Sequence, residues 1–157
     1  MAGVALREIE DGDLDGLFEQ MRDAESVRMA AFVFRDPGDR AEFDAHMARV
    51  RSAPGTMNRA ITRDGLLVGS IASFVIEGDT EITYWIDRSV WGQGVASAAL
   101  TLFLQRQRIR PLHARAASDN AGSLRVLEKA GFRVTGAAVS YAPARAANIE
   151  ETLLRLD

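Results

Sequence analysis

The first third of the chain has the hydrophobic spacing of helices after one short extended segment. Residues 4–9 are predicted to form a first strand. Apolar residues then recur at the i, i+3, i+4, i+7 spacing of one helix face, in the set Leu14, Leu17, Phe18 and Met21. Residues 27–37 are apolar without a clear period and end in turn residues. Asp39 and Glu42 then have the spacing of a capping box, which predicts a second helix with Phe43, Met47 and Val50 on its buried face.

The middle of the chain has the pattern of strands joined by tight turns. Residues 56–62 lead into Arg-Asp-Gly, a hairpin signal, and a β-rich run follows over 66–76. A second turn, Glu-Gly-Asp, leads to a strand over 81–86. In that strand one face carries Ile82, Tyr84 and Ile86, and the other carries Glu81, Thr83 and Trp85.

Helices and strands alternate in the last part of the chain. A helix is predicted from about Val95, with a face formed by Ala96, Ala99, Leu100, Phe103 and Leu104. Residues 112–117 read as a short strand. The next helix has Asn120 as its N-cap and Gly131 as its C′ residue. Two strands follow, over 132–140 and 149–156.

This order of elements predicts the fold class. One strand, two helices, three strands, a helix, a strand, a helix and two strands indicate an α+β protein, with a mixed sheet covered by helices on both faces. No repeat, low-complexity tract or linker interrupts the sequence, so residues 1–157 are predicted to form a single domain.

Composition narrows the function classes. The formal net charge of −3 argues against a nucleic-acid partner, which usually meets a basic surface. The chain has no cysteine, which excludes thiolate metal sites and cysteine nucleophiles, and its two histidines make a histidine-based metal site unexpected. The longest apolar run, residues 95–104, is about half a membrane span. The beginning of the chain has no leader pattern, so a cytoplasmic protein without a membrane partner is expected.

A glycine-rich junction lies between the strand at 81–86 and the following helix. Gly92, Gly94, Ala96 and Ser97 are small residues at a helix N-terminus, where backbone N–H groups are unsatisfied and the helix dipole is positive. Such a junction is either a turn or a backbone site for phosphate.

Two phosphate-binding alternatives fit this junction poorly. A P-loop requires a lysine after its last glycine, whereas the only lysine of the chain is Lys129. A dinucleotide fingerprint requires a third glycine, and Ser97 stands there. Asp119 has the spacing of the acidic residue that follows that fingerprint, but only 38 residues remain after it, too few to complete a doubly wound sheet. A coenzyme A pyrophosphate site is the third alternative.

Two motifs together resemble those of the GNAT superfamily of N-acetyltransferases, most similarly its branch of ribosomal-protein N-terminal acetyltransferases. The first, YWIDRSVWGQGVASAAL, has Trp91, Gly94 and Ala96 at the positions of the coenzyme loop of the family. The second, ASDNAGSLRVLEKAGF, matches with Asn120, Ser123 and the pair Gly131–Phe132. The family fold has about six to seven strands in a mostly antiparallel sheet, and strands four and five, here 81–86 and 112–117, splay apart.

The resemblance implies acetyl-CoA as the co-substrate and no metal. In family members the pantetheine arm lies in the splay, which here would place it along Trp85 and Ile86, next to Asn120 and Ser123. The pyrophosphate would lie on the N–H groups of the loop, formed by Trp91, Gly92, Gln93, Gly94, Val95, Ala96 and Ser97.

The resemblance also suggests how the acetyl group moves. Transfer in the family is direct, in a ternary complex with a primary amine, either a small molecule or a protein N-terminus. Glu81 is a candidate general base; alternatively it is a strand-end carboxylate that is solvated or paired with an arginine. Leu127 stands where many members have the tyrosine that acts as general acid, and Ser123 is the nearest substitute. Ser123 could equally be an ordinary third residue of its helix.

A second function of the same fold stays open. A non-catalytic acyl-CoA-binding or regulatory module would keep the coenzyme loop without efficient transfer. A homodimer is also compatible with the resemblance. The sequence does not identify the acceptor.

Overall fold

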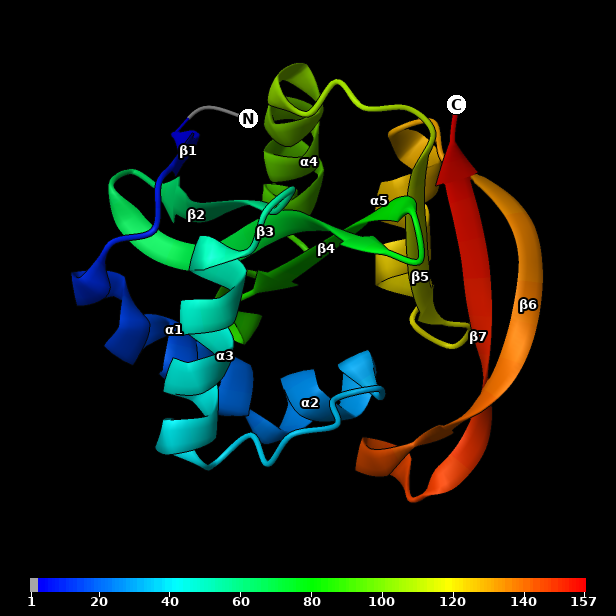
Figure 1. Ribbon diagram of the computed structural model, residues 1–157, viewed down its shortest axis with the longest axis horizontal. Helices are drawn as coiled ribbons and strands as arrows, with labels where there is room; N and C mark the ends of the chain where they lie inside the picture. The colour runs from blue at the N-terminus through cyan, green and yellow to red at the C-terminus, as the bar shows by residue number, and fades with distance from the viewer. Residues whose placement is uncertain (1–2) are drawn as a thin grey trace.

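The computed structural model describes residues 3–157, and Figure 1 shows their arrangement. The helices are α1 (Leu14–Arg22), α2 (Ala24–Ala30), α3 (Arg40–Ser52), α4 (Val95–Arg106) and α5 (Ala121–Lys129). The strands are β1 (Val4–Arg7), β2 (Met57–Arg63), β3 (Leu66–Ile76), β4 (Asp79–Ile86), β5 (Leu112–Ala117), β6 (Arg133–Ala142) and β7 (Ala147–Leu156). Three short 3₁₀ turns accompany them: η1 (Asp11–Asp13), η2 (Arg88–Val90) and η3 (Pro143–Arg145).

The seven strands form one sheet in the order β1-β2-β3-β4-β5-β7-β6. All neighbouring strands are antiparallel except β4 and β5, which are parallel. The predicted α+β class with a mostly antiparallel sheet is therefore confirmed.

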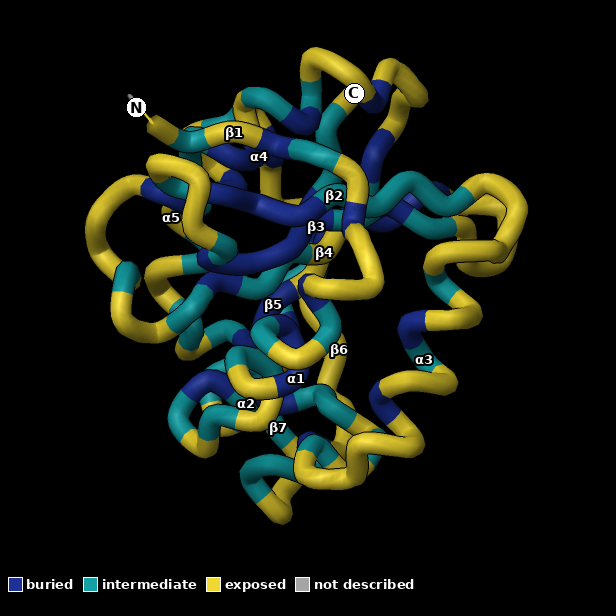
Figure 2. The backbone as a smooth tube through the Cα atoms, turned by 90° about the vertical axis from the view of Figure 1, so that its left-hand side faces the viewer, coloured by how far each residue is buried: buried dark blue, intermediate teal, exposed yellow. Residues whose placement is uncertain are grey.

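Helices cover both faces of this sheet because successive strand residues point to opposite sides. Ile61 of β2 packs with α4 and α5 in the larger core cluster, whereas its neighbour Ala60 packs with α1 and α3. In the same way Val68 of β3 faces α4, and Leu67 lies against the α1–α3 cluster. Figure 2 shows the buried residues concentrated in the central strands.

The parallel strands β4 and β5 stay together for only two residue pairs. Thr80 is opposite Leu112 and Glu81 is opposite His113, and the register ends there. Beyond Glu81 the two strands diverge, as Figure 1 shows. The predicted splay between strands four and five is confirmed, and Glu81 stands where it begins.

One prediction about element order is wrong. Three helices, not two, precede β2, because the short helix α2 occupies part of the region that the hydrophobic period left unassigned. Asp23 caps this helix, its carboxylate accepting from the backbone N–H of Ser26 at 3.1 Å. The first strand also ends at Arg7, two residues before its expected end. Among residues 3–157, none of the helices is both long and apolar enough to cross a bilayer.

Candidate functional site

The glycine loop joins β4 to α4 through two residues with left-handed backbone. Gly92 has φ 74° and Gly94 has φ 78°, values that side-chain-bearing residues adopt at a cost. Gly94 is the N-cap of α4, and no side chain caps the first turn of the helix. The N–H groups of that turn therefore have no side-chain acceptor, and they form the positive end of the dipole of a twelve-residue helix.

Side chains of the loop are tied back to the sheet. The indole Nε1 of Trp91 donates to the carbonyl oxygen of Ile86, the last residue of β4, at 2.9 Å. The guanidinium of Arg63, at the end of β2, donates to the side-chain oxygen of Gln93. Arg63 brings a positive charge to a loop suited to an anion. Sequence reasoning missed it because it lies 30 residues upstream, on another strand.

Helix α5 contacts β4 on the face that also carries α4. The Asn120 side chain caps α5 by accepting from the N–H of Ser123 at 3.2 Å, which confirms the predicted cap. The hydroxyl of Ser123 lies 2.8 Å from the hydroxyl of Tyr84 on β4. Burial raises the pKa of Tyr84, against a smaller opposing effect of its hydrogen bond with Ser123. The phenol is therefore protonated at neutral pH.

The opposite face of the splay carries charged residues. Glu81 is 7% exposed and is paired with Arg115 of β5, so the expected alternative of an arginine partner is observed. The same guanidinium also reaches Glu151 of β7, 6% exposed, which the sequence analysis did not single out. The three side chains meet because β5 pairs with both β4 and β7.

A small hollow lies between β4, β5 and α5. Its lining combines residues from both sides of the sheet: Ile82, Thr83, Tyr84, Ala114, Arg115, Ser123 and Leu127. Alternation along β4 places Tyr84 toward α5 and Thr83 on the face of Glu81. An extended group lying in the splay would therefore have Tyr84 and Ser123 on one side and Arg115 on the other.

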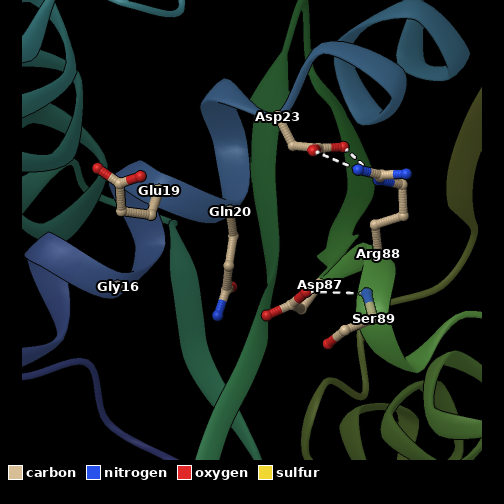
Figure 3. A pocket seen from close by; sticks show the side chains of 7 residues that line it. All are labelled: Gly16, Glu19, Gln20, Asp23, Asp87, Arg88 and Ser89. Atoms are coloured by element: carbon tan, nitrogen blue, oxygen red, sulfur yellow. Dashed lines mark hydrogen bonds and ion pairs between the residues drawn. The ribbon is translucent and has the colours of Figure 1, made fainter.

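A second, larger pocket of about 600 Å³ lies between α1 and the start of the loop. Figure 3 shows Gln20 of α1 and Asp87 at the end of β4 lining it, while Arg88 pairs with Asp23 at its upper edge. The Trp85 indole donates to the carbonyl of Gln20 at 3.0 Å, so the side chain of Trp85 anchors α1. Only the backbone of Trp85 and Ile86 is then left to line the splay.

The predicted loop and the start of α5 lie together beside the carboxyl half of β4, whereas Glu81 lies near the amino end of that strand. The loop, Trp91 to Ser97, begins α4 beside the carboxyl end of β4, and Asn120 and Ser123 begin α5 beside the same strand. Glu81 is at the start of the opening, on the other face. Within residues 3–157, no group of three or more histidine, aspartate or glutamate side chains is placed to hold a metal ion.

Comparison with known proteins places this arrangement in a family. The family model described as an acetyltransferase (GNAT) domain matches residues 4–133. None of the curated proteins is similar enough in sequence to match.

Solved structures share the fold at low sequence identity. The spermidine N-acetyltransferase from Vibrio cholerae, in complex with CoA and spermine, has a TM-score of 0.84 at 15% identity, over 99% of this chain and 96% of that one. Mycobacterium smegmatis RimJ, in complex with CoA-disulfide, has a TM-score of 0.81 at 22% identity, over 98% and 81% of the two chains. A putative acetyltransferase from Salmonella typhimurium, yncA, with its cofactor acetyl-CoA, has a TM-score of 0.77 at 18% identity, over 99% and 94%.

Proposed function

Because the chain belongs to the GNAT family of acetyltransferases, we propose that it transfers the acetyl group of acetyl-CoA directly to a primary amine. The acceptor is a small molecule or a peptide N-terminus. The observation that carries this proposal is that a glycine loop with left-handed backbone and no side-chain cap follows β4, the strand that separates from β5.

The loop would hold the donor by its pyrophosphate. Backbone N–H groups from Trp91 to Ser97 are the donors, and the dipole of α4 adds to their attraction for an anion. The pantetheine arm would lie along Trp85 and Ile86, where β4 has left β5, next to Asn120 and Ser123. Solved structures of similar fold contain acetyl-CoA or CoA, which supports a coenzyme A thioester as the donor.

The reaction needs a base because an ammonium has no free electron pair. Glu81 is the proposed base: it is buried, at the point where β4 and β5 begin to separate, and on the face opposite α5. One proton of the ammonium passes to solvent, and the free electron pair of the neutral amine bonds to the thioester carbon. The carbon–sulfur bond then breaks, and the second proton that the nitrogen must lose passes to Glu81. An N–H of the unpaired edge of β4 would stabilise the negative charge that develops on the carbonyl oxygen.

The departing sulfur needs a proton. Ser123 is the proposed donor, and its hydroxyl is hydrogen-bonded to the Tyr84 phenol at 2.8 Å. The phenol can return a proton to Ser123 after transfer. Leu127, where the family commonly has tyrosine, is buried in the lining of the same hollow, so the hydroxyl pair substitutes for the missing group.

The direct test measures free thiol released from acetyl-CoA in the presence of peptides, polyamines, amino acids and aminoglycosides. Release that depends on one class of amine supports the proposal. Binding of acetyl-CoA without turnover on any amine would contradict it and favour the non-catalytic module.

Replacement of the base supplies a second test. Glu81→Gln is expected to lower kcat/KM by about 100-fold or more at pH values where the wild-type base is ionised. The variant should also lack the acidic limb of the pH profile, which is the fall of kcat/KM at low pH. Glu77→Gln, in the exposed turn before β4, is the matched control and should change neither. An unchanged pH profile in Glu81→Gln would exclude Glu81 as the base.

A further inference from the structure

Two buried carboxylates share one arginine beside the splay. Arg115 places Nε 3.0 Å and Nη2 2.9 Å from the same oxygen, Oε1 of Glu81, and its Nη1 lies 3.3 Å from Oε1 of Glu151. The carboxylate side chains are only 9% and 8% exposed, whereas that of Arg115 is 52% exposed. One positive charge therefore faces two negative charges in a poorly hydrated position.

Glu151 is the less compensated of the two. Burial raises its pKa, which the charge and hydrogen bond of Arg115 only partly offset, and the negative charge of Glu81 raises it further. Opposite Glu151, strand β6 places Ala138, which has no charge. His113, opposite Glu81 in the register of β5, lies 3.7 Å from the carboxylate of Asp79. The charged side chains of α2 and η3 also form pairs of their own: Arg28 with Glu25, and Arg145 with Asp119.

The cluster thus lacks one positive charge while both carboxylates are ionised. A proton on Glu81 would supply it and leave Arg115 and Glu151 as a balanced pair. Without Glu151, the guanidinium would already be balanced by Glu81 alone, and protonation of Glu81 would leave Arg115 without a partner. The negative charge of Glu151 therefore stabilises protonated Glu81, which is the form of the base after it has accepted the proton of the amine.

We propose that Glu151 is a positioning residue for acetyl transfer: by sharing Arg115 with Glu81, it lets Glu81 accept the proton of the acceptor amine. This inference rests on the proposed function, because Glu81 must be the base. Arg115 connects the cluster to the reaction, since it is one of the residues that line the hollow between β4, β5 and α5.

The test compares Glu151→Gln with Glu150→Gln. Glu150 is the preceding residue of β7 and is exposed, so its replacement changes the net charge equally without touching Arg115. In Glu151→Gln the acidic limb of kcat/KM is expected to move to lower pH by about one unit, because a negative charge near Glu81 is lost. The maximal rate should fall about tenfold, with KM for acetyl-CoA unchanged. Glu150→Gln should behave as the wild type.

Arg115→Gln tests the same electrostatics in the opposite direction. Removing the shared cation should move the acidic limb to higher pH, because two buried carboxylates are left without their partner. An acidic limb that stays at the wild-type pH in Glu151→Gln, or in Arg115→Gln where the former is unfolded, would overturn the inference.

The roles of Glu81 and Glu151 are distinguished by their variants. If Glu81→Gln keeps the acidic limb, the proposed base is wrong and the inference falls with it. If Glu81→Gln removes the limb but Glu151→Gln leaves it in place, only the role of Glu151 is wrong.

Discussion

Replacement of Gly94 by valine tests the coenzyme loop most sharply. At φ 78° a residue with a Cβ pays about 1–2 kcal/mol of backbone strain, which corresponds to a fall in Tm of roughly 2–8 °C for a chain of this size. The branched side chain would also keep an anion away from the N–H groups of α4. Loss of one hydrogen bond to a charged group costs about 1.5–3 kcal/mol, or roughly 10- to 150-fold in affinity for acetyl-CoA.

Gly65→Val separates the two effects. Gly65 has φ 81° in the β2–β3 turn, and a Cβ there would meet nothing within 4 Å, so the variant carries the strain without touching the loop. Thermal unfolding with and without acetyl-CoA measures both quantities. Both variants should lose intrinsic stability, and only Gly94→Val should lose the stabilisation by acetyl-CoA. Equal stabilisation of the two variants by acetyl-CoA would refute the assignment of the loop, and so would stabilisation of the wild type by NAD(P) but not by acetyl-CoA.

Two further predictions concern stability. A Cβ at Gly69 would collide with the backbone oxygen of Trp85, so Gly69→Ala should lower the free energy of unfolding, measured by chemical denaturation, by about 1–3 kcal/mol. In the control Gly136→Ala, the Cβ would lie 4.0 Å from the nearest side chain, so the free energy of unfolding should hardly change. Equal losses in the two variants would contradict the close approach of β3 and β4. The hydrogen bonds from Arg7 lower the pKa of Asp13. The ionised carboxylate therefore stabilises the folded protein fully at pH values above the usual aspartate pKa of about 4, and this stabilisation is lost as the pH falls through the lowered pKa. Asp13→Asn should therefore cost about 1–2 kcal/mol at pH 7 and progressively less in acid, and a cost independent of pH would contradict this linkage.

Features set by contiguous residues were predictable from the sequence. The alternation over residues 81–86, the start of a helix at Val95 and the cap at Asn120 are local, and each is observed as predicted. Gly131 likewise ends α5 with φ 105°. The splay followed from these motifs only through the resemblance to the family, because no local pattern indicates where two strands separate.

Helix α2 was not predicted because it has only seven residues, too few to establish a helical period, although Asp23 and Ser26 have the spacing of a cap.

Features set by pairing of distant strands were not predictable. Glu81 and Arg115 are 34 residues apart, and Glu151 is a further 36 away. Nothing in the sequence indicates that β7 lies next to β5, which is what brings the second carboxylate to the site.

The account depends above all on direct transfer from acetyl-CoA to an amine. The most direct measurement quantifies free thiol, acetylated acceptor and acetylated enzyme in the same reaction, with and without the amine. Thiol and acetylated amine are expected in equal amounts, only when the amine is present, with no acetyl group left on the protein. Thiol release without amine, or accumulation of an acetylated protein, would contradict the account.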